Sequence, residues 1–307
     1  MRKLFRKKIA EGWMSVHGQA GMVGLAHVVR QSGAPPVVRM LESYAADHDF
    51  SGALKQLAKT HGLANYRCCT LLADKDYRIT QTDLPEVPAG EQIAALRWQL
   101  KDAVDFPLVD AAIDCIAIPG EQQGRKQGVF AVAAARTVVA SVVERFADAK
   151  IKLAAIDIPE MALRNISALF APSRRGNALL LIGAENTQFV VTYEGDLVLS
   201  RRIDLSAPQL AAASEDRQTA LLERIGLELQ RTLDAFERQF SFISIAGLTI
   251  ACAEDIPSLD ERLKDSLYIS ITPLDLASVL DISAIPELRN PLWQARCLHL
   301  IGGGLRD

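Results

Sequence analysis

Two glycine-containing hairpins are the first features of this sequence that could do chemistry. Residues 177–204 predict three strands, with Gly183 closing the first turn and Glu194-Gly195-Asp196 closing the second. Residues 13–29 repeat the pattern of strand, glycine turn at Gly18, and strand. Backbone N–H groups freed by a glycine turn form an anion nest, and two facing nests can hold one nucleotide. The repeat is typical of a duplicated phosphate-cradling domain, although hairpins of this kind can also be purely structural.

Other catalytic patterns are missing from the sequence. It contains no G-x-S-x-G nucleophile elbow, no H-E-x-x-H zinc motif, no P-loop and no G-x-G-x-x-G fingerprint. The five cysteines and five histidines lack the spacing of metal ligands. Four aspartates fall on a predicted helix end, a loop and a strand, which favours a solvated face over acid/base catalysis: Asp102, Asp105, Asp110 and Asp114. We therefore expect no catalytic residue and no metal site.

Composition narrows the class of protein further. A chain of 307 residues with 49% apolar and 23% charged residues can build two domains with cores of their own. The net charge of −3 argues against a nucleic-acid partner, which would require an extended basic face. The most apolar stretch, 128–143, carries Arg136 and is shorter than the roughly 20 residues that span a bilayer. The sequence thus predicts a soluble, cytoplasmic protein with reduced cysteines.

The first eleven residues predict a basic amphipathic tail. Five basic side chains surround Leu4, Phe5 and Ile9. Such a segment binds anionic lipid, because each basic residue near that surface gains about 1 kcal/mol. It also matches a solvated, frayed terminus, so both interpretations stay open.

A small subdomain is predicted inside the first half of the chain. The loop 85–90 contains two prolines and a glycine, and it precedes a helix at 91–104 with apolar residues at helical spacing. Two strands and a second helix follow, at 114–118, 128–135 and 136–149. In the second half, a continuous apolar stripe predicts one long helix: Leu222, Ile225, Leu229, Leu233, Phe236 and Phe240.

Four segments match one protein family: 96–110, 156–165, 227–234 and 300–306. Their order and spacing resemble the MshI family of agglutinin (MSHA pilus) biogenesis proteins, relatives of PilM in type IV pilus assembly. The resemblance implies an α/β fold of the actin-like, duplicated RNase H-like kind, with a small inserted subdomain in the first half and a reduced second half. The implied parts are a basic tail (1–11), a first RNase H-like subdomain (12–85 with 151–172), the insertion (86–150) and a second RNase H-like subdomain (173–307).

The resemblance also implies that the nucleotide site is damaged. In actin-like ATPases, each hairpin turn carries an aspartate two residues before a glycine, and this aspartate holds Mg²⁺. Here His17 takes the first acid position with Gln19 at its glycine, and Leu181 takes the second. Mg²⁺ requires hard oxygen ligands, which neither side chain supplies. The surviving candidates for a vestigial nucleotide site are Gly183, Asn186, Thr187, Glu228, Arg231 and Gly303.

The function implied by the resemblance is a non-catalytic cytoplasmic scaffold of the MSHA pilus assembly platform, peripheral to the inner membrane. Its expected partner is the cytoplasmic tail of a PilN-like inner-membrane protein, bound by edge-strand pairing or in an apolar groove between the first subdomain and the insertion. Trp98 lies off the apolar stripe of its helix and is a candidate partner contact. No cofactor is required, but the alternative is a nucleotide-gated switch that binds ATP with little or no hydrolysis. A second rival is a working ATPase with relocated acids.

Overall fold

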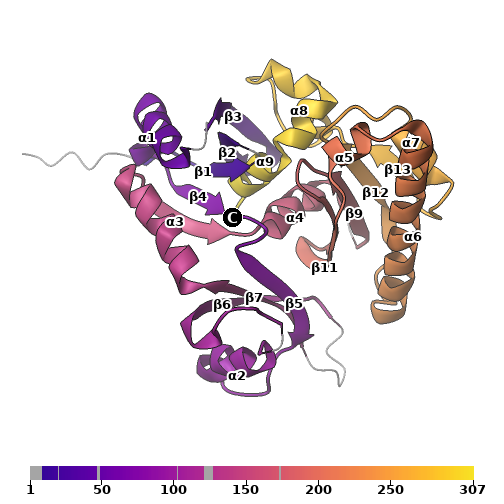
Figure 1. Cartoon of the computed structure of the whole chain (residues 1–307), viewed down its shortest axis with the longest axis horizontal. Coiled ribbons are helices and arrows are strands. Elements are labelled where there is room, and N and C mark those ends of the chain that lie inside the picture. Colours follow the sequence, from indigo (N-terminus) through magenta and orange to yellow (C-terminus); the bar gives the residue numbers. More distant parts are fainter. Residues whose placement is uncertain (1–8, 20, 47–48, 102, 121–126, 173) are drawn as a thin grey trace, which may run out of the picture. The chain divides into compact units, whose positions relative to one another are not determined.

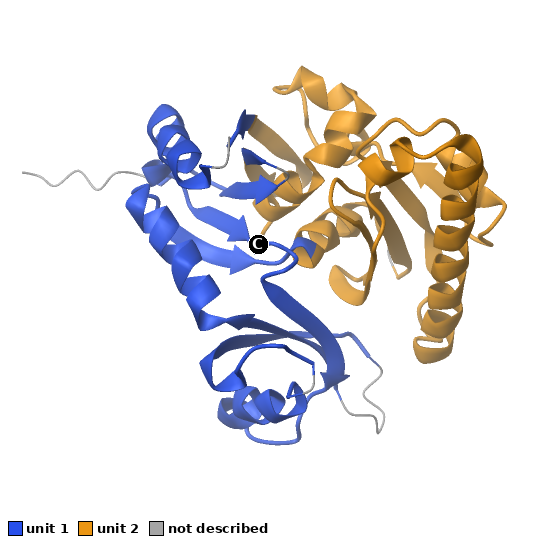
Figure 2. Ribbon diagram, in the orientation of Figure 1, with its two compact units in different colours: residues 1–24, 43–159 blue, residues 25–42, 160–307 orange. Residues whose placement is uncertain are grey.

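The structure is a computed structural model that describes residues 9–19, 21–46, 49–101, 103–120, 127–172 and 174–307 (Figure 1). Residues 1–8 of the predicted basic tail, and Asp102 of the four aspartates, lie outside the described residues. The chain forms two compact units, one from residues 1–24 and 43–159 and the other from 25–42 and 160–307 (Figure 2).

Two five-stranded sheets have the same construction. The first has the order β3-β2-β1-β4-β8 and the second the order β11-β10-β9-β12-β13. In each sheet the first hairpin strand has its hairpin neighbour on one side and a parallel strand on the other: β4 beside β1, and β12 beside β9. The predicted repeat of two hairpin-opened halves is therefore present. The strands are β1 (Trp13–Gln19), β2 (Met22–Gln31), β3 (Ala34–Ala45), β4 (Cys68–Leu71), β8 (Leu153–Asp157), β9 (Gly176–Ile182), β10 (Thr187–Tyr193), β11 (Asp196–Ile203), β12 (Ile245–Cys252) and β13 (Ile271–Pro273).

Apolar patterning explains the core of the second unit. Every residue of β9 is buried, as expected for a central strand that is covered on both faces. All six residues of the apolar stripe predicted for the long helix are buried, five of them in α6 and Phe240 at its C-terminal cap. The helices of the chain are α1 (Phe50–His61), α2 (Gln92–Gln99), α3 (Arg136–Asp148), α4 (Pro159–Phe170), α5 (Ala207–Ala211), α6 (Glu215–Gln239), α7 (Leu259–Lys264), α8 (Pro291–Arg296) and α9 (Leu298–Gly304).

The third sheet is small and antiparallel, with the order β5-β7-β6. Its strands are β5 (Tyr77–Asp83), β6 (Ala111–Ala117) and β7 (Gly128–Ala135). Leu96 of helix α2 and Leu100 at its C-terminal cap form a core with Val129, Ala131 and Ala133 of β7. Strand β5 precedes residue 86, so the small sheet takes one strand from outside the range predicted for the insertion. The subdomain boundaries themselves stay a prediction.

Among the described residues, no helix combines the length and the apolar composition needed to cross a membrane.

Candidate functional site

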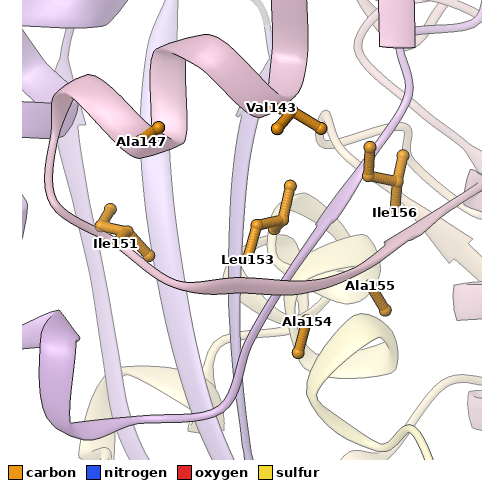
Figure 3. Close-up of a pocket in the computed structure, with 7 residues that line it drawn as sticks. All are labelled: Val143, Ala147, Ile151, Leu153, Ala154, Ala155 and Ile156. Atoms are coloured by element: carbon orange, nitrogen blue, oxygen red, sulfur yellow. The ribbon is translucent and has the colours of Figure 1, made fainter. Parts of the chain in front are cut away.

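An apolar groove lies between helix α3 and strand β8 in the first unit (Figure 3). Its volume is about 390 Å³. All of its lining residues are aliphatic: Val143, Ala147, Ile151, Leu153, Ala154, Ala155 and Ile156. A groove of this composition binds apolar side chains and offers no side chain for acid/base or metal chemistry.

Strand β8 supplies the floor of the groove because of its place in the sheet. Among the described strands it pairs only with β4, in parallel, so it lies at the edge of the sheet. The pairing shifts between Leu153 and Ala155, so Ala154 is an extra residue on β8. Leu153 and Ile156 consequently lie opposite Cys68 and Thr70, two residues apart on β4, and share one face. Figure 3 shows both side chains on the side of the strand that faces α3.

Helix α3 supplies the opposite wall. Its buried residues Val142 and Phe146 face the core. Val143 and Ala147, four residues apart, therefore lie together on another face of the helix and line the groove. Val143 is 47% exposed, so about half of its surface is open in the groove. The helix thus presents apolar surface that the described chain does not cover.

The edge of β8 is suited to pairing with another strand. Natural edge strands are commonly protected by lysine, proline or a covering element. Four of the five β8 residues are aliphatic, and the charged residue, Asp157, stands at the end of the strand. Lys150 and Lys152 are exposed just before the strand, and Glu144 and Asp148 are exposed on α3. The groove therefore combines an apolar floor, an open edge and a charged rim, which is the arrangement that binds an extended peptide.

The first hairpin turn does not fit Mg²⁺ or a phosphate. His17 is buried at the end of β1, and burial lowers the pKa of its imidazole to about 4, against smaller raising effects from a backbone hydrogen bond at Leu71 and the charge of Asp74. The ring is therefore neutral at pH 7. The glycine turn predicted at Gly18 is wrong, because Gly18 lies within β1 and the left-handed glycine before β2 is Gly21. A Cβ atom at Gly18 would lie 2.3 Å from the ring of Phe50, so this ring packs against the backbone of β1 directly after His17.

The second hairpin turn uses its polar groups internally. Gly183 donates its N–H to the carbonyl of Asn186 at 2.9 Å, and its own carbonyl accepts from Ala207 at 2.7 Å. The hydroxyl of Thr187 is buried and donates to the carbonyl of Leu205 at 2.7 Å. Leu181, at the acid position, is buried and aliphatic. The structure thus brings Gly183, Asn186 and Thr187 together at one turn, where each of them takes part in a structural hydrogen bond.

The other predicted nucleotide residues lie on helices. Glu228 pairs with Arg224 at 3.7 Å on the half-exposed side of α6, and Arg231 is exposed one turn further on. Gly303 is buried in α9. Its neighbour Gly302 packs directly against the backbone of α4, and Asn165 donates to the Gly302 carbonyl at 2.8 Å. Close helix packing therefore gives Gly302 a structural role, and Gly303 is buried beside it.

Trp98, the predicted partner contact, is 80% exposed in the last turn of α2 and is not one of the residues that line the groove. The preceding residue, Arg97, holds α2 in place by donating to the carbonyls of Leu108 and Ala111. Of the four aspartates, Asp105 pairs with Arg78 at 3.0 Å and Asp114 accepts from the Cys115 N–H. Among the described residues, no group of three or more His, Cys, Asp or Glu side chains is placed to hold a metal ion.

Comparison with known proteins gives matches among solved structures only. No known family profile and no curated protein matches the sequence. A chain of a PilM–PilN type IV pilus biogenesis complex superposes with a TM-score of 0.75 at 21% identity, over 96% of this chain and 99% of that one. The fold is actin-like. The α/β class is thereby confirmed, with two mixed sheets and a small inserted antiparallel sheet.

Two other solved structures are similar over most of the chain. One is a Bacteroides thetaiotaomicron protein with an actin-like ATPase fold, at 11% identity and a TM-score of 0.49, covering 94% of this chain and 99% of that one. The other is the cytoplasmic domain of EpsL, an inner-membrane component of the Vibrio cholerae type II secretion system, at 13% identity and a TM-score of 0.46. This match covers 83% of the present chain and 94% of EpsL's domain.

The groove residues were not predicted from the sequence. The signals for them were weak: an aliphatic edge strand with two central alanines, and an exposed valine four residues before an alanine on α3. Periodicity alone cannot distinguish such residues from ordinary core positions, because the distinction depends on whether a neighbouring element covers them.

Proposed function

We propose that this protein is a non-catalytic cytoplasmic scaffold of a type IV pilus assembly platform of the MSHA kind. In this proposal, the groove between α3 and β8 binds the cytoplasmic tail of a PilN-like inner-membrane protein. The observation that carries the proposal is the aliphatic groove beside an open strand edge. The similarity to a structure of a PilM–PilN complex supports the choice of partner.

The tail binds as an added strand. Extended chain rises about 3.3 Å per residue, so the five residues of β8 pair with roughly five or six residues of the tail. Backbone hydrogen bonds at the edge supply affinity for any extended peptide. Specificity comes from alternate tail side chains, which enter the space between Val143 and Leu153 and are apolar for that reason. Binding to a membrane-anchored tail places the protein at the cytoplasmic face of the inner membrane.

The hairpin turns support a role without ATP turnover. Neither His17 nor Leu181 supplies an oxygen ligand for Mg²⁺, and the ring of Phe50 packs against Gly18, the residue after His17. The second candidate is a switch that binds ATP without hydrolysing it. It rests on the glycine kept at Gly183, whose N–H is bonded to the Asn186 carbonyl in this structure. A thermal-shift titration with ATP and Mg²⁺ separates these functions. No shift supports the scaffold, a shift without phosphate release supports the switch, and phosphate release supports an ATPase.

Binding of the tail is measured by fluorescence anisotropy with a labelled synthetic peptide of the partner's cytoplasmic N-terminal segment. Val143→Glu places a charge in the groove, and we expect it to weaken binding at least tenfold, because a carboxylate next to apolar side chains stays poorly solvated. Val109→Glu is the matched control, since Val109 is 76% exposed in the same unit and does not line the groove. The proposal fails if the wild-type protein does not bind the peptide, or if Val143→Glu binds it as tightly as Val109→Glu does.

A further inference from the structure

The outer face of α6 is a large surface that the proposed function does not use. This helix has 25 residues, so it is about 37 Å long. The buried stripe of α6 packs against the interior of its own unit. The exposed leucine Leu227 lies at the centre of the opposite face, with 47% of its surface exposed. Figure 1 shows α6 at the outer side of its unit, beside α7.

Two rows of charge run along this face at seven-residue spacing. One row contains four arginines and the other contains the residue before each arginine, which is acidic in three cases. The rows are Arg217, Arg224, Arg231 and Arg238, and Asp216, Glu223, Gln230 and Glu237. With 3.6 residues per turn, the arginine row lies roughly 20–80° to one side of Leu227 and the acidic row roughly 20–80° to the other. All of these residues except the half-buried Gln230 are exposed.

We propose that α6 pairs with α6 of a second copy of this chain, in parallel, around a two-fold axis along the helices. Rotation about that axis brings the arginine row of one copy opposite the acidic row of the other, on both sides of a central Leu227 contact. An antiparallel pair would place arginines opposite arginines. A strict seven-residue repeat also keeps two helices in register when they coil left-handedly around each other.

The charge pattern favours a second copy over other occupants. The acidic row beside the arginines repels an anionic lipid surface or a nucleic acid, which would bind an arginine row on its own. Arg224 is already engaged, since it pairs with Glu228 and donates to the carbonyl of Asp204. In the described part of the chain, Arg231 and Arg238 have no ion pair, so their charges are available to a partner.

The pairing is weak and depends on salt. Exposed ion pairs each stabilise a contact only slightly, and ions screen them beyond about 8 Å at physiological ionic strength. Assembly is therefore concentration-dependent, and many copies held at one platform would favour it. This inference does not depend on the groove or on its occupant.

Sedimentation velocity of the full chain tests the pairing. We expect reversible dimers at low salt, with a dissociation constant that rises about tenfold or more on going to 0.5 M NaCl. A variant with three arginines changed to glutamate and a variant with three acids changed to lysine are each expected to be monomeric, and their mixture to form heterodimers. The changes are Arg217→Glu, Arg231→Glu and Arg238→Glu in one, and Asp216→Lys, Glu223→Lys and Glu237→Lys in the other.

Controls separate this contact from general charge effects and from unfolding. Changing three exposed arginines elsewhere to glutamate alters the net charge equally and should leave the dimer intact: Arg136, Arg174 and Arg289. The single change Leu227→Asp should also give a folded monomer, which circular dichroism checks. Ala220→Cys should form a disulfide between two copies above the wild-type background only if the helices are parallel. A monomeric wild type at low salt, or a mixture that stays monomeric, overturns the proposal.

Discussion

Gly302→Ala tests whether the terminal glycines are there for packing. A Cβ atom at this position would lie 2.2 Å from the carbonyl oxygen of Ala162 and 2.7 Å from its carbonyl carbon. Both atoms belong to the backbone of α4, so no side-chain rotation can relieve the overlap. Helix α9 must move away, and the buried hydrogen bond from Asn165 to the Gly302 carbonyl, 2.8 Å long, is then strained or lost.

The expected loss of stability follows from these contacts. Overpacking a buried site costs about 1–3 kcal/mol. Leaving buried hydrogen-bonding groups unpaired costs about 1–3 kcal/mol more. The higher helix propensity of alanine relative to glycine stabilises the folded protein by about 1 kcal/mol. The central values give a net loss of about 3 kcal/mol, which for a unit of this size lowers Tm by roughly 6–12 °C.

The assay is thermal and urea unfolding followed by circular dichroism. Gly90→Ala is the matched control, because a Cβ atom at Gly90 meets no described atom within 4 Å and its backbone is not left-handed. We expect that control to change Tm by no more than about 2 °C, in line with a surface change of about 0.5 kcal/mol. If Gly302→Ala is as stable as the wild type, α9 does not pack closely on α4 at this glycine. That result would favour a ligand-binding role for the terminal glycines.

Three further predictions concern the turns and the tail. The purified protein should release no phosphate from ATP, and release that Glu228→Ala abolishes would contradict this prediction. The double variant His17→Asp with Leu181→Asp should gain Mg²⁺ binding if the turns are vestigial. Because burial lowers the pKa of His17 from 6.5 to about 4, protonation favours the unfolded state, so stability is complete above pH 6.5 and falls by up to about 3 kcal/mol towards pH 4. His17→Gln should remove this slope in urea titrations, and an unchanged slope would assign it to other groups. Deleting residues 1–9 should leave Tm unchanged and reduce co-sedimentation with anionic liposomes at low salt, whereas equal sedimentation would make the tail a frayed terminus.

The repeated sheets and the long helix were predictable from the sequence because local patterns specify them. Glycines between apolar runs indicate both hairpins, although the first turn lies at Gly21 and not at the predicted Gly18. The stripe from Leu222 to Phe240 has the period of a helix with one buried face. The assignment of His17 and Leu181 to the two acid positions came instead from the family resemblance. The hairpins and the long helix each depend on residues that are near one another in the chain.

Tertiary contacts decided the candidate site. Whether β5 pairs within the first sheet or with β7 depends on non-local hydrogen bonds that its own residues do not encode. Val143 and Ile156 read as core residues in the sequence, and they line a groove only because no described element covers the outer edge of β8. The need for glycine at position 302 likewise depends on a tertiary contact, because α9 packs there against the backbone of α4. Sequence periodicity shows which side chains are apolar and which face they share, but only the packed structure shows which of those faces another element leaves open.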